Sequence, residues 1–267
     1  MITDQEFQRI VMYVKSKSGI NLSEKKVLVQ GRLDNYMQRK GYSSYHEFMD
    51  LVEKFPAGPE AEDLMNALTT NHTYFWREHE QFLFLKQEVF PELKRYTEHT
   101  RDWRIWCAAS STGEEPYTLA MLCMDFLGLE MSQWDTTILA TDIDTKVLET
   151  AVRGVYSKNS VEQLPQQYVR RFFRPVSGEQ YQVKDELKKQ VLFRRFNLMH
   201  QLPFRKPLHV VFIRNVMIYF DEPTKEKLLE SIYEKMAPGG YLFIGSTESI
   251  SQSNTKFRYV RPSIYRK

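Results

Sequence analysis

The first 70 residues show the hydrophobic period of α-helices. Apolar side chains recur at helical steps, at Phe7, Ile10, Val11 and Val14. Two capping boxes signal helix starts, Thr3 with Glu6 and Ser44 with Glu47, and glycine or proline follows each of the first three apolar stretches. We therefore expect four helices, the first ending at Gly19 and the others at about residues 23–40, 44–54 and 60–69.

Beyond about residue 80, short apolar runs alternate with helical segments. One helix is expected over residues 81–96. Strands are expected at 104–108, 137–144, 209–215 and 241–247, and the alternating segment 257–267 could add another. Helices are expected after the turn at 111–116, at 145–153 and at 223–236, with a turn at 238–240. This alternation predicts a mostly parallel, doubly wound α/β sheet.

Residues 155–195 interrupt the alternation. Two short strands are expected there, at 180–187 and 191–197, around a helical turn. We interpret this stretch as a small antiparallel β-subdomain inserted into the sheet domain. The expected organisation is a helical N-terminal domain over residues 1–75 and a sheet domain over 76–267, with the insertion at about 155–195.

Composition narrows the classes of protein. The 267 residues are 42% hydrophobic and 27% charged, which suits a folded core and argues against disorder. A net charge of +3 permits an acidic partner but is weaker than the usual footprint of nucleic-acid binding. Cys107 and Cys123 lie among apolar neighbours, as buried thiols of a cytoplasmic protein do. We expect no signal peptide, no membrane insertion and no metal site, since none of their patterns occurs.

The stretch 106-WCAASSTGEEPYTLA-120 has the form of a strand, a turn and a helix. Ligands of open α/β sheets bind at such strand ends. A phosphate loop needs several glycines, yet this turn has one, and Glu114 and Glu115 would repel a phosphate. Carboxylates here suit an adenosyl ligand with a positive charge, such as S-adenosylmethionine. The alternative is that both glutamates complement the helix dipole. Glu115 is our candidate for ligand contact, and Glu114 for the helix start.

Three more strand ends or junctions carry polar residues. Asp142 lies 29 residues after Gly113 and could accept the hydroxyls of a ribose, while Asp144 suits the cap of the next helix. Both acids could equally be caps or solvated turn residues. The segment 71-NHTYFWRE-78 places Arg77 between the two domains, and 214-RNVMIYFD-221 places Tyr219 after an apolar strand. Aromatic residues in such runs are also ordinary core residues.

In this order, the motifs resemble the chemotaxis receptor methyltransferase family, CheR. The likeness rests on 71-NHTYFWRE-78, 106-WCAASSTGEEPYTLA-120, 140-ATDIDTKVLETA-151, 196-FNL-198, 211-VFIRNVMIYFD-221 and 238-PGGYLFIGSTE-248. The chain departs from common family patterns at Trp76, where Phe is usual, and at Ser110, where Cys or Ala is frequent. The resemblance implies a Rossmann-like class I methyltransferase sheet behind a helical N-terminal domain. It also implies transfer of methyl groups from S-adenosylmethionine to glutamates of chemoreceptors, leaving S-adenosylhomocysteine.

By matching positions, the resemblance also implies the site residues. Arg77 and Tyr219 would flank the point of methyl transfer. The implied cofactor contacts are Asn71, Thr73, Arg77, Glu115, Asp142, Asn197, Leu198, Arg214 and Asn215. A glutamate acceptor is already ionised at pH 7, so no general base is expected.

The partner implied by the resemblance is the cytoplasmic helical domain of chemoreceptors. The basic residues of 1–40 would dock on its acidic surface, although solvated helix faces would show the same pattern. Some family members grip a receptor's C-terminal tail with the inserted subdomain. The short segment 174-RPVSGEQ-180 resembles members that do not depend on the tail.

Other functions are less consistent with the motifs. Nucleic-acid methyltransferases usually carry an Asp/Asn-Pro-Pro-aromatic tetrapeptide or a Pro-Cys nucleophile, and neither occurs. A dinucleotide oxidoreductase would show G-x-G-x-x-G. A regulator that binds the cofactor without activity is disfavoured by the presence of Arg77 and Tyr219.

Overall fold

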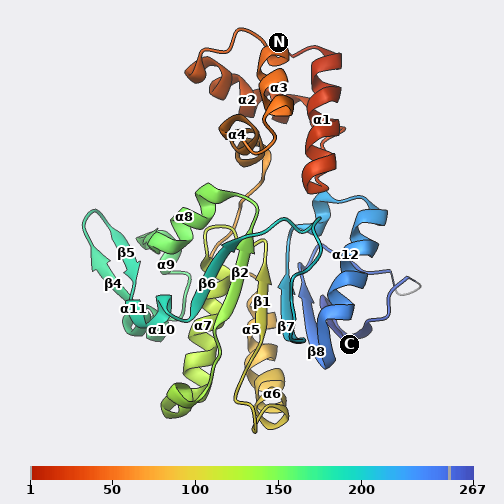
Figure 1. The fold of residues 1–267 in the computed structure, drawn as a ribbon. Coiled ribbons are helices and arrows are strands. Elements are labelled where there is room, and N and C mark those ends of the chain that lie inside the picture. The colour runs from red at the N-terminus through yellow and green to blue at the C-terminus, as the bar shows by residue number, and fades with distance from the viewer. Residues whose placement is uncertain (1, 252–253) are drawn as a thin grey trace.

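Four helices form the N-terminal part of the protein. In the computed structural model, which describes residues 2–251 and 254–267, they are α1 (Asp4–Ser18), α2 (Lys26–Lys40), α3 (Tyr45–Lys54) and α4 (Pro59–Leu68). Thr3 and Glu6 form the expected capping box, and Gly19 ends α1 with a φ of 75°. The second box is incomplete, because the Glu47 carboxylate accepts from Ser43. Figure 1 shows the four helices gathered beyond one end of the sheet.

The main sheet has seven strands, in the order β6-β2-β1-β7-β8-β10-β9. Their bounds are β1 (Ile105–Ala108), β2 (Ile138–Asp142), β6 (Val191–Arg195), β7 (Leu208–Ile213), β8 (Met236–Ile244), β9 (Arg258–Arg261) and β10 (Ile264–Arg266). The first five in the spatial order are parallel, and β10 and β9 add an antiparallel edge. The chain leaves β1 toward β2 and β6, then returns to β7 on the other side. The switch point therefore lies between β1 and β7.

Helices cover both faces of the main sheet, which confirms the doubly wound class (Figure 1). They are α5 (His79–Phe84), the π-helical turn η1 (Leu85–Val89), α6 (Phe90–Tyr96), α7 (Glu114–Leu127), η2 (Gly128–Gln133), α8 (Thr145–Arg153), the 3-10 turn η3 (Met217–Tyr219) and α12 (Glu222–Lys235). Side chains of β1 alternate between two cores. Trp106 joins a core that is continuous with the N-terminal helices, and Cys107 joins the core under α7.

A separate three-stranded antiparallel sheet lies beside the main one, in the order β3-β5-β4. Its strands are β3 (Val155–Ser157), β4 (Phe173–Val176) and β5 (Gln180–Val183). The same segment also forms the helices α9 (Lys158–Val161), α10 (Gln166–Phe172) and α11 (Asp185–Lys188). The prediction that the strand at 191–197 belongs to this subdomain is wrong. This strand is β6, and it pairs in parallel with β2 across residues 191–195, so the small sheet ends before it.

The C-terminal part differs from expectation at one turn. The segment 238–240 lies inside β8, where the register against β7 shifts after Leu208, and Gly239 has a φ of 78°. It is therefore a distortion within a longer strand, and no turn precedes the strand there. The final segment forms two strands, β9 and β10, instead of one. No helix in residues 2–251 or 254–267 combines the length and apolarity needed to cross a bilayer.

Candidate functional site

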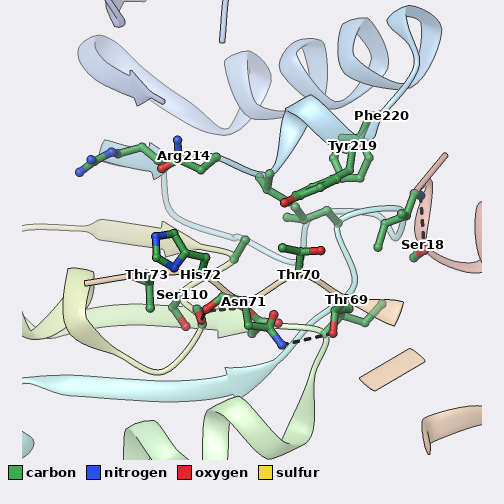
Figure 2. Close-up of a pocket in the computed structure, with 18 of the residues that line it drawn as sticks. Ser18, Thr69, Thr70, Asn71, His72, Thr73, Ser110, Arg214, Tyr219 and Phe220 are labelled. Atoms are coloured by element: carbon green, nitrogen blue, oxygen red, sulfur yellow. Dashed lines mark hydrogen bonds between the residues drawn. The ribbon is translucent and has the colours of Figure 1, made fainter. Parts of the chain in front are cut away.

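A cavity of about 1270 Å³, counted with its open mouth, lies where β1, β2, β6 and β7 end. Its walls also include the connection from the N-terminal helices and the start of α2. All ten residues implied by the sequence line it: Asn71, Thr73, Arg77, Glu115, Asp142, Asn197, Leu198, Arg214, Asn215 and Tyr219. Figure 2 shows Asn71 and Thr73 on one side of this space and Tyr219 on the other.

Asp142 ends β2 with a buried carboxylate. It accepts hydrogen bonds from the backbone N–H groups of Ser111 (2.8 Å) and Asp144 (2.9 Å). Burial raises the pKa of Asp142 from its ordinary 3.8 to about 6, because those hydrogen bonds offset only part of the lost hydration. The carboxylate thus stands at the strand end with N–H partners on both oxygens.

Asp144 caps α8, as expected. Its Oδ1 accepts from the backbone N–H of Lys146 at 2.9 Å, and its Oδ2 accepts from Asn71 Nδ2 (2.7 Å) and Thr69 Oγ1 (2.9 Å). The cap therefore also holds the segment that joins the helical part to the sheet. Asn71 lines the cavity from that segment.

The turn after β1 has three residues with left-handed backbone angles, and only one of them is glycine. Ala109, Ser111 and Gly113 all have left-handed φ angles, of 53°, 49° and 96°. Such angles in non-glycine residues store strain, which concentrates at functional sites. A Cβ on Gly113 would lie 2.9 Å from Ala151 Cβ, so this glycine is required by packing against α8. The Ser110 hydroxyl lines the cavity, is buried and has no hydrogen-bond partner among the described residues.

Glu115 faces a buried arginine. Its Oε2 lies 2.9 Å from Arg214 Nη1, and Cys107 Sγ donates to its Oε1 at 3.1 Å. Burial raises the pKa of Glu115, and the Arg214 charge opposes that rise. Arg214 has only 2% of its side chain exposed, donates to the Arg77 carbonyl at 2.6 Å and lies 3.3 Å from Glu78 Oε2. The two carboxylates share one guanidinium.

Glu114 has a different environment. It begins α7, as expected, and its Oε2 accepts from Thr112 Oγ1 at 2.6 Å. It is buried, and burial raises the pKa of its carboxyl. Glu115 lines the cavity, whereas Glu114 is not among the lining residues.

Arg77 and Tyr219 reach the cavity from different segments. Arg77 Nη1 donates to the His72 carbonyl at 2.8 Å, and its guanidinium lies 5.6 Å from the Tyr74 ring centroid. Tyr219 ends η3, and its carbonyl accepts from the backbone N–H of Asn21 at 2.8 Å. The chain after α1 is therefore attached to the segment that carries Tyr219.

Asn197 also ties the helical part to the sheet. It follows β6, and its Nδ2 donates to the carbonyl of Lys17, near the end of α1, at 2.5 Å. Leu198 lines the cavity next to it. Asn215, after β7, has a φ of 57° and donates through Nδ2 to Glu78 Oε1 at 3.3 Å.

Sequence reasoning missed two carboxylates behind the cavity, Glu78 and Glu248. Glu78 has a left-handed φ of 58° and accepts from the backbone N–H of Ser246 at 3.0 Å. Glu248 accepts from the backbone around Asn215. Both belong to motifs quoted above, yet a single acidic residue in a loop gives no sign of its partners. Also missed were wall residues from the N-terminal part, such as Lys25 and Leu28.

The cavity suits a cationic adenosyl ligand. Asp142 offers a strand-end carboxylate, Ser110 a hydroxyl that needs a partner, and Glu115 a second carboxylate in the wall. Within the described residues, no group of three or more His, Cys, Asp or Glu side chains could hold a metal ion.

Comparison with known proteins agrees with this chemistry. A family model described as "CheR methyltransferase, SAM binding domain" matches residues 71–265, and "CheR methyltransferase, all-alpha domain" matches residues 5–69. S-adenosylmethionine is thus the cofactor of the sheet domain.

Relatives match over nearly their full lengths. A chemotaxis protein methyltransferase of Borreliella burgdorferi is 37% identical over 270 residues, which cover 100% of this chain and 95% of the relative. That of Escherichia coli is 33% identical over 269 residues, covering 99% and 91%. Chemotaxis protein methyltransferase 2 of Pseudomonas aeruginosa is 36% identical over 270 residues, covering 98% and 93%. The chain belongs to the CheR methyltransferase family.

Proposed function

We propose that the protein methylates glutamate side-chain carboxylates of chemoreceptors, using S-adenosylmethionine and forming glutamate methyl esters during sensory adaptation. The observation that carries this proposal is the convergence of all ten candidate residues on one cavity between the helical part and the sheet. The relatives' names, chemotaxis protein methyltransferases, support the choice of acceptor.

Residues at the strand ends would hold the cofactor, whose sulfonium supplies an activated methyl group. Asp142 would accept hydrogen bonds from the ribose hydroxyls, and Glu115 with Arg214 would form the polar wall beside β1 and β7. The remaining contacts would come from Asn71, Thr73, Arg77, Asn197, Leu198 and Asn215.

The acceptor needs no general base. A glutamate carboxylate with an ordinary pKa of about 4.3 is ionised at pH 7 and is already a nucleophile. Catalysis is then mainly alignment. Arg77 and Tyr219 both line the cavity and would hold the cofactor or the carboxylate in line. Their contact with the carboxylate must be modest, because a strong ion pair would lower the nucleophilicity of the attacking oxygen. A site with little water favours the meeting of carboxylate and sulfonium.

Variants of these two residues test the alignment. Tyr219→Phe and Arg77→Ala should lower the rate of methyl transfer more than they lower cofactor affinity, because alignment matters chiefly in the transition state. Radiolabel transfer gives the rate, and calorimetry gives the affinity. Turnover equal to that of the unaltered protein would remove both residues from this role.

The helical domain, which we delimit at residues 1–75, would dock the receptor. Several of its basic side chains are already paired, since Arg9 contacts Asp50 and Glu53, and Lys15 contacts Asp221. Lys25 is exposed at the start of α2 and also lines the cavity. An acidic receptor surface could therefore meet positive charge at the mouth of the site.

We further propose that this member works without a receptor's C-terminal tail. In the small sheet, which we place within the insertion at about 155–195, β4 and β5 are joined by the short turn 177–179. Such a turn leaves little chain with which to enclose a bound tail. Calorimetry with a receptor-tail peptide tests this, and tight binding would overturn it.

One experiment tests substrate and linkage together. Labelled S-adenosylmethionine is incubated with the protein and receptor-rich membranes, with tRNA and DNA as alternative acceptors. We expect base-labile label on the receptor, as a carboxyl methyl ester would give. Label that enters only nucleic acid, or none at all, would refute the proposed acceptor.

A further inference from the structure

The buried carboxylate of Glu248 accepts hydrogen bonds from the backbone of two loops, one after β7 and one after β8. Its Oε2 accepts from the backbone N–H groups of Gly245 (2.6 Å) and Asn215 (2.9 Å). Its Oε1 accepts from those of Met217 (2.7 Å) and Ile218 (3.2 Å). The residue is 9% exposed and is not among those that line the cavity. Its charge is therefore satisfied by the chain itself.

The two loops approach so closely that one position requires glycine. A Cβ on Gly245 would lie 2.5 Å from Asn215 Nδ2, 2.8 Å from Glu248 Oε2 and 2.9 Å from the backbone nitrogen of Asn215. Asn215 itself has a left-handed φ of 57°, a conformation that asparagine tolerates better than most residues. The loop after β7 is thus held in a strained conformation by its contacts with Gly245 and Glu248.

This loop carries much of the site. Arg214, Asn215 and Tyr219 all lie on it and all line the cavity. Hydrogen bonds to a charged acceptor are stronger than those between neutral groups, and three of the four donors belong to this loop. The bonds from Met217 and Ile218 immediately precede Tyr219.

We propose that Glu248 is a positioning residue for methyl transfer, which acts by fixing the loop of residues 214–219 and thereby the Tyr219 side chain. The proposal rests on the function proposed above. In Glu248→Gln, the amide NH2 must face N–H donors on one side, so two of the four bonds are lost whichever way the amide turns.

The first measurement is hydrogen exchange, which requires no methyl acceptor. Full-length Glu248→Gln is compared with the unaltered protein and with Glu234→Gln, which removes an exposed carboxylate from α12. We expect amides 215–218 to exchange at least about tenfold faster in Glu248→Gln and unchanged in the control. Equal exchange in all three proteins would overturn the proposal, whatever the acceptor proves to be.

The second measurement is kinetic. We expect kcat for receptor methylation to fall about 10- to 100-fold, the loss that misplacement by about 1 Å causes, while affinity for S-adenosylhomocysteine changes less than about threefold. Tyr219→Phe and Glu248→Gln combined should cost less than the product of their separate effects, since both act at the Tyr219 hydroxyl. A purely structural role would give multiplicative effects and would overturn the proposal.

Two outcomes separate this proposal from the proposed function. Unaltered protein that labels no receptor refutes the function, while hydrogen exchange still decides the role of Glu248 in holding the loop. An active unaltered protein matched by Glu248→Gln refutes the positioning role alone. If Glu248→Gln does not purify folded, Gly245→Ala disturbs the same contact from the other side and is judged by the same results.

Discussion

The buried carboxylate of Asp142, the proposed ribose acceptor, lowers the stability of the folded protein. Asp142 is only 7% exposed, and this burial raises the pKa of its carboxyl from 3.8 to about 6. Two backbone N–H groups donate to it, from Ser111 and Asp144, but it has no ion-pair partner among the described residues. Replacing it in Asp142→Asn removes the titration while keeping the size of the side chain.

Because the pKa of Asp142 differs between the folded and unfolded states, the free energy of unfolding depends on pH. Between pH 3.8 and about 6 the folded state holds a proton on Asp142 that the unfolded chain has released, so stability falls as pH rises through this window. One pKa unit corresponds to about 1.4 kcal/mol, and the shift of Asp142 therefore amounts to about 3 kcal/mol. This penalty is absent below the unfolded pKa and is complete above the folded pKa.

Urea unfolding of both proteins between about pH 3 and 7.5 measures the effect. Other carboxylates titrate in both proteins and cancel in the difference between their free energies of unfolding. We expect the unaltered protein to lose about 3 kcal/mol relative to Asp142→Asn as pH rises across the window. Cofactor at about 100 times its Kd should add about 2.7 kcal/mol to the unaltered protein only. A difference that does not change with pH would refute the reasoning.

Two further substitutions probe packing around the site. Gly113→Ala should destabilise by about 1–3 kcal/mol in urea unfolding, because φ is 96° and the new methyl would meet Ala151. Its control, Gly31→Ala in α2, has open space and should stabilise by about 0.5–1 kcal/mol, so equal effects would contradict the argument. Trp106→Phe should cost about 2–3 kcal/mol, since Trp106 is fully buried and its Nε1 donates to Thr141 Oγ1 at 2.9 Å. A loss below about 0.5 kcal/mol would show that neighbouring side chains refill the space.

Structural features that depend only on residues close together in the sequence could be predicted. The capping box at Thr3, the left-handed Gly19 and the cap at Asp144 depend on residues within a few positions of one another. The acidic end of β2 and the polar end of β7 were also predictable, because parallel strands bring their carboxyl ends to one edge. Asn197 and Leu198 also follow a predicted strand, but only the family resemblance assigned them a contact with the cofactor.

Features that depend on pairing between distant segments were missed. The strand at 191–195 carries Arg194 and Arg195, so its sequence did not show that it pairs with β2 in the main sheet. Glu248 could be understood only once the chain had brought the N–H groups of the loop at 215–218 to it. A carboxylate that accepts from distant backbone has no local pattern to reveal it.

The turn after β1 explains why a phosphate loop was the wrong comparison. Ala109 and Ser111 make the left-handed bends, and Gly113 is required by Ala151 instead of by a ligand. Near the turn, Glu115 and Glu78 are balanced by Arg214 and Arg77, whose charged atoms lie within 3.9 Å of them. Asp142 has no such cation within ion-pair distance among the described residues, so its carboxylate is an unpaired acidic group at the strand end. A carboxylate without a cation at this position disfavours a pyrophosphate, and this agrees with the S-adenosylmethionine cofactor of the sheet domain.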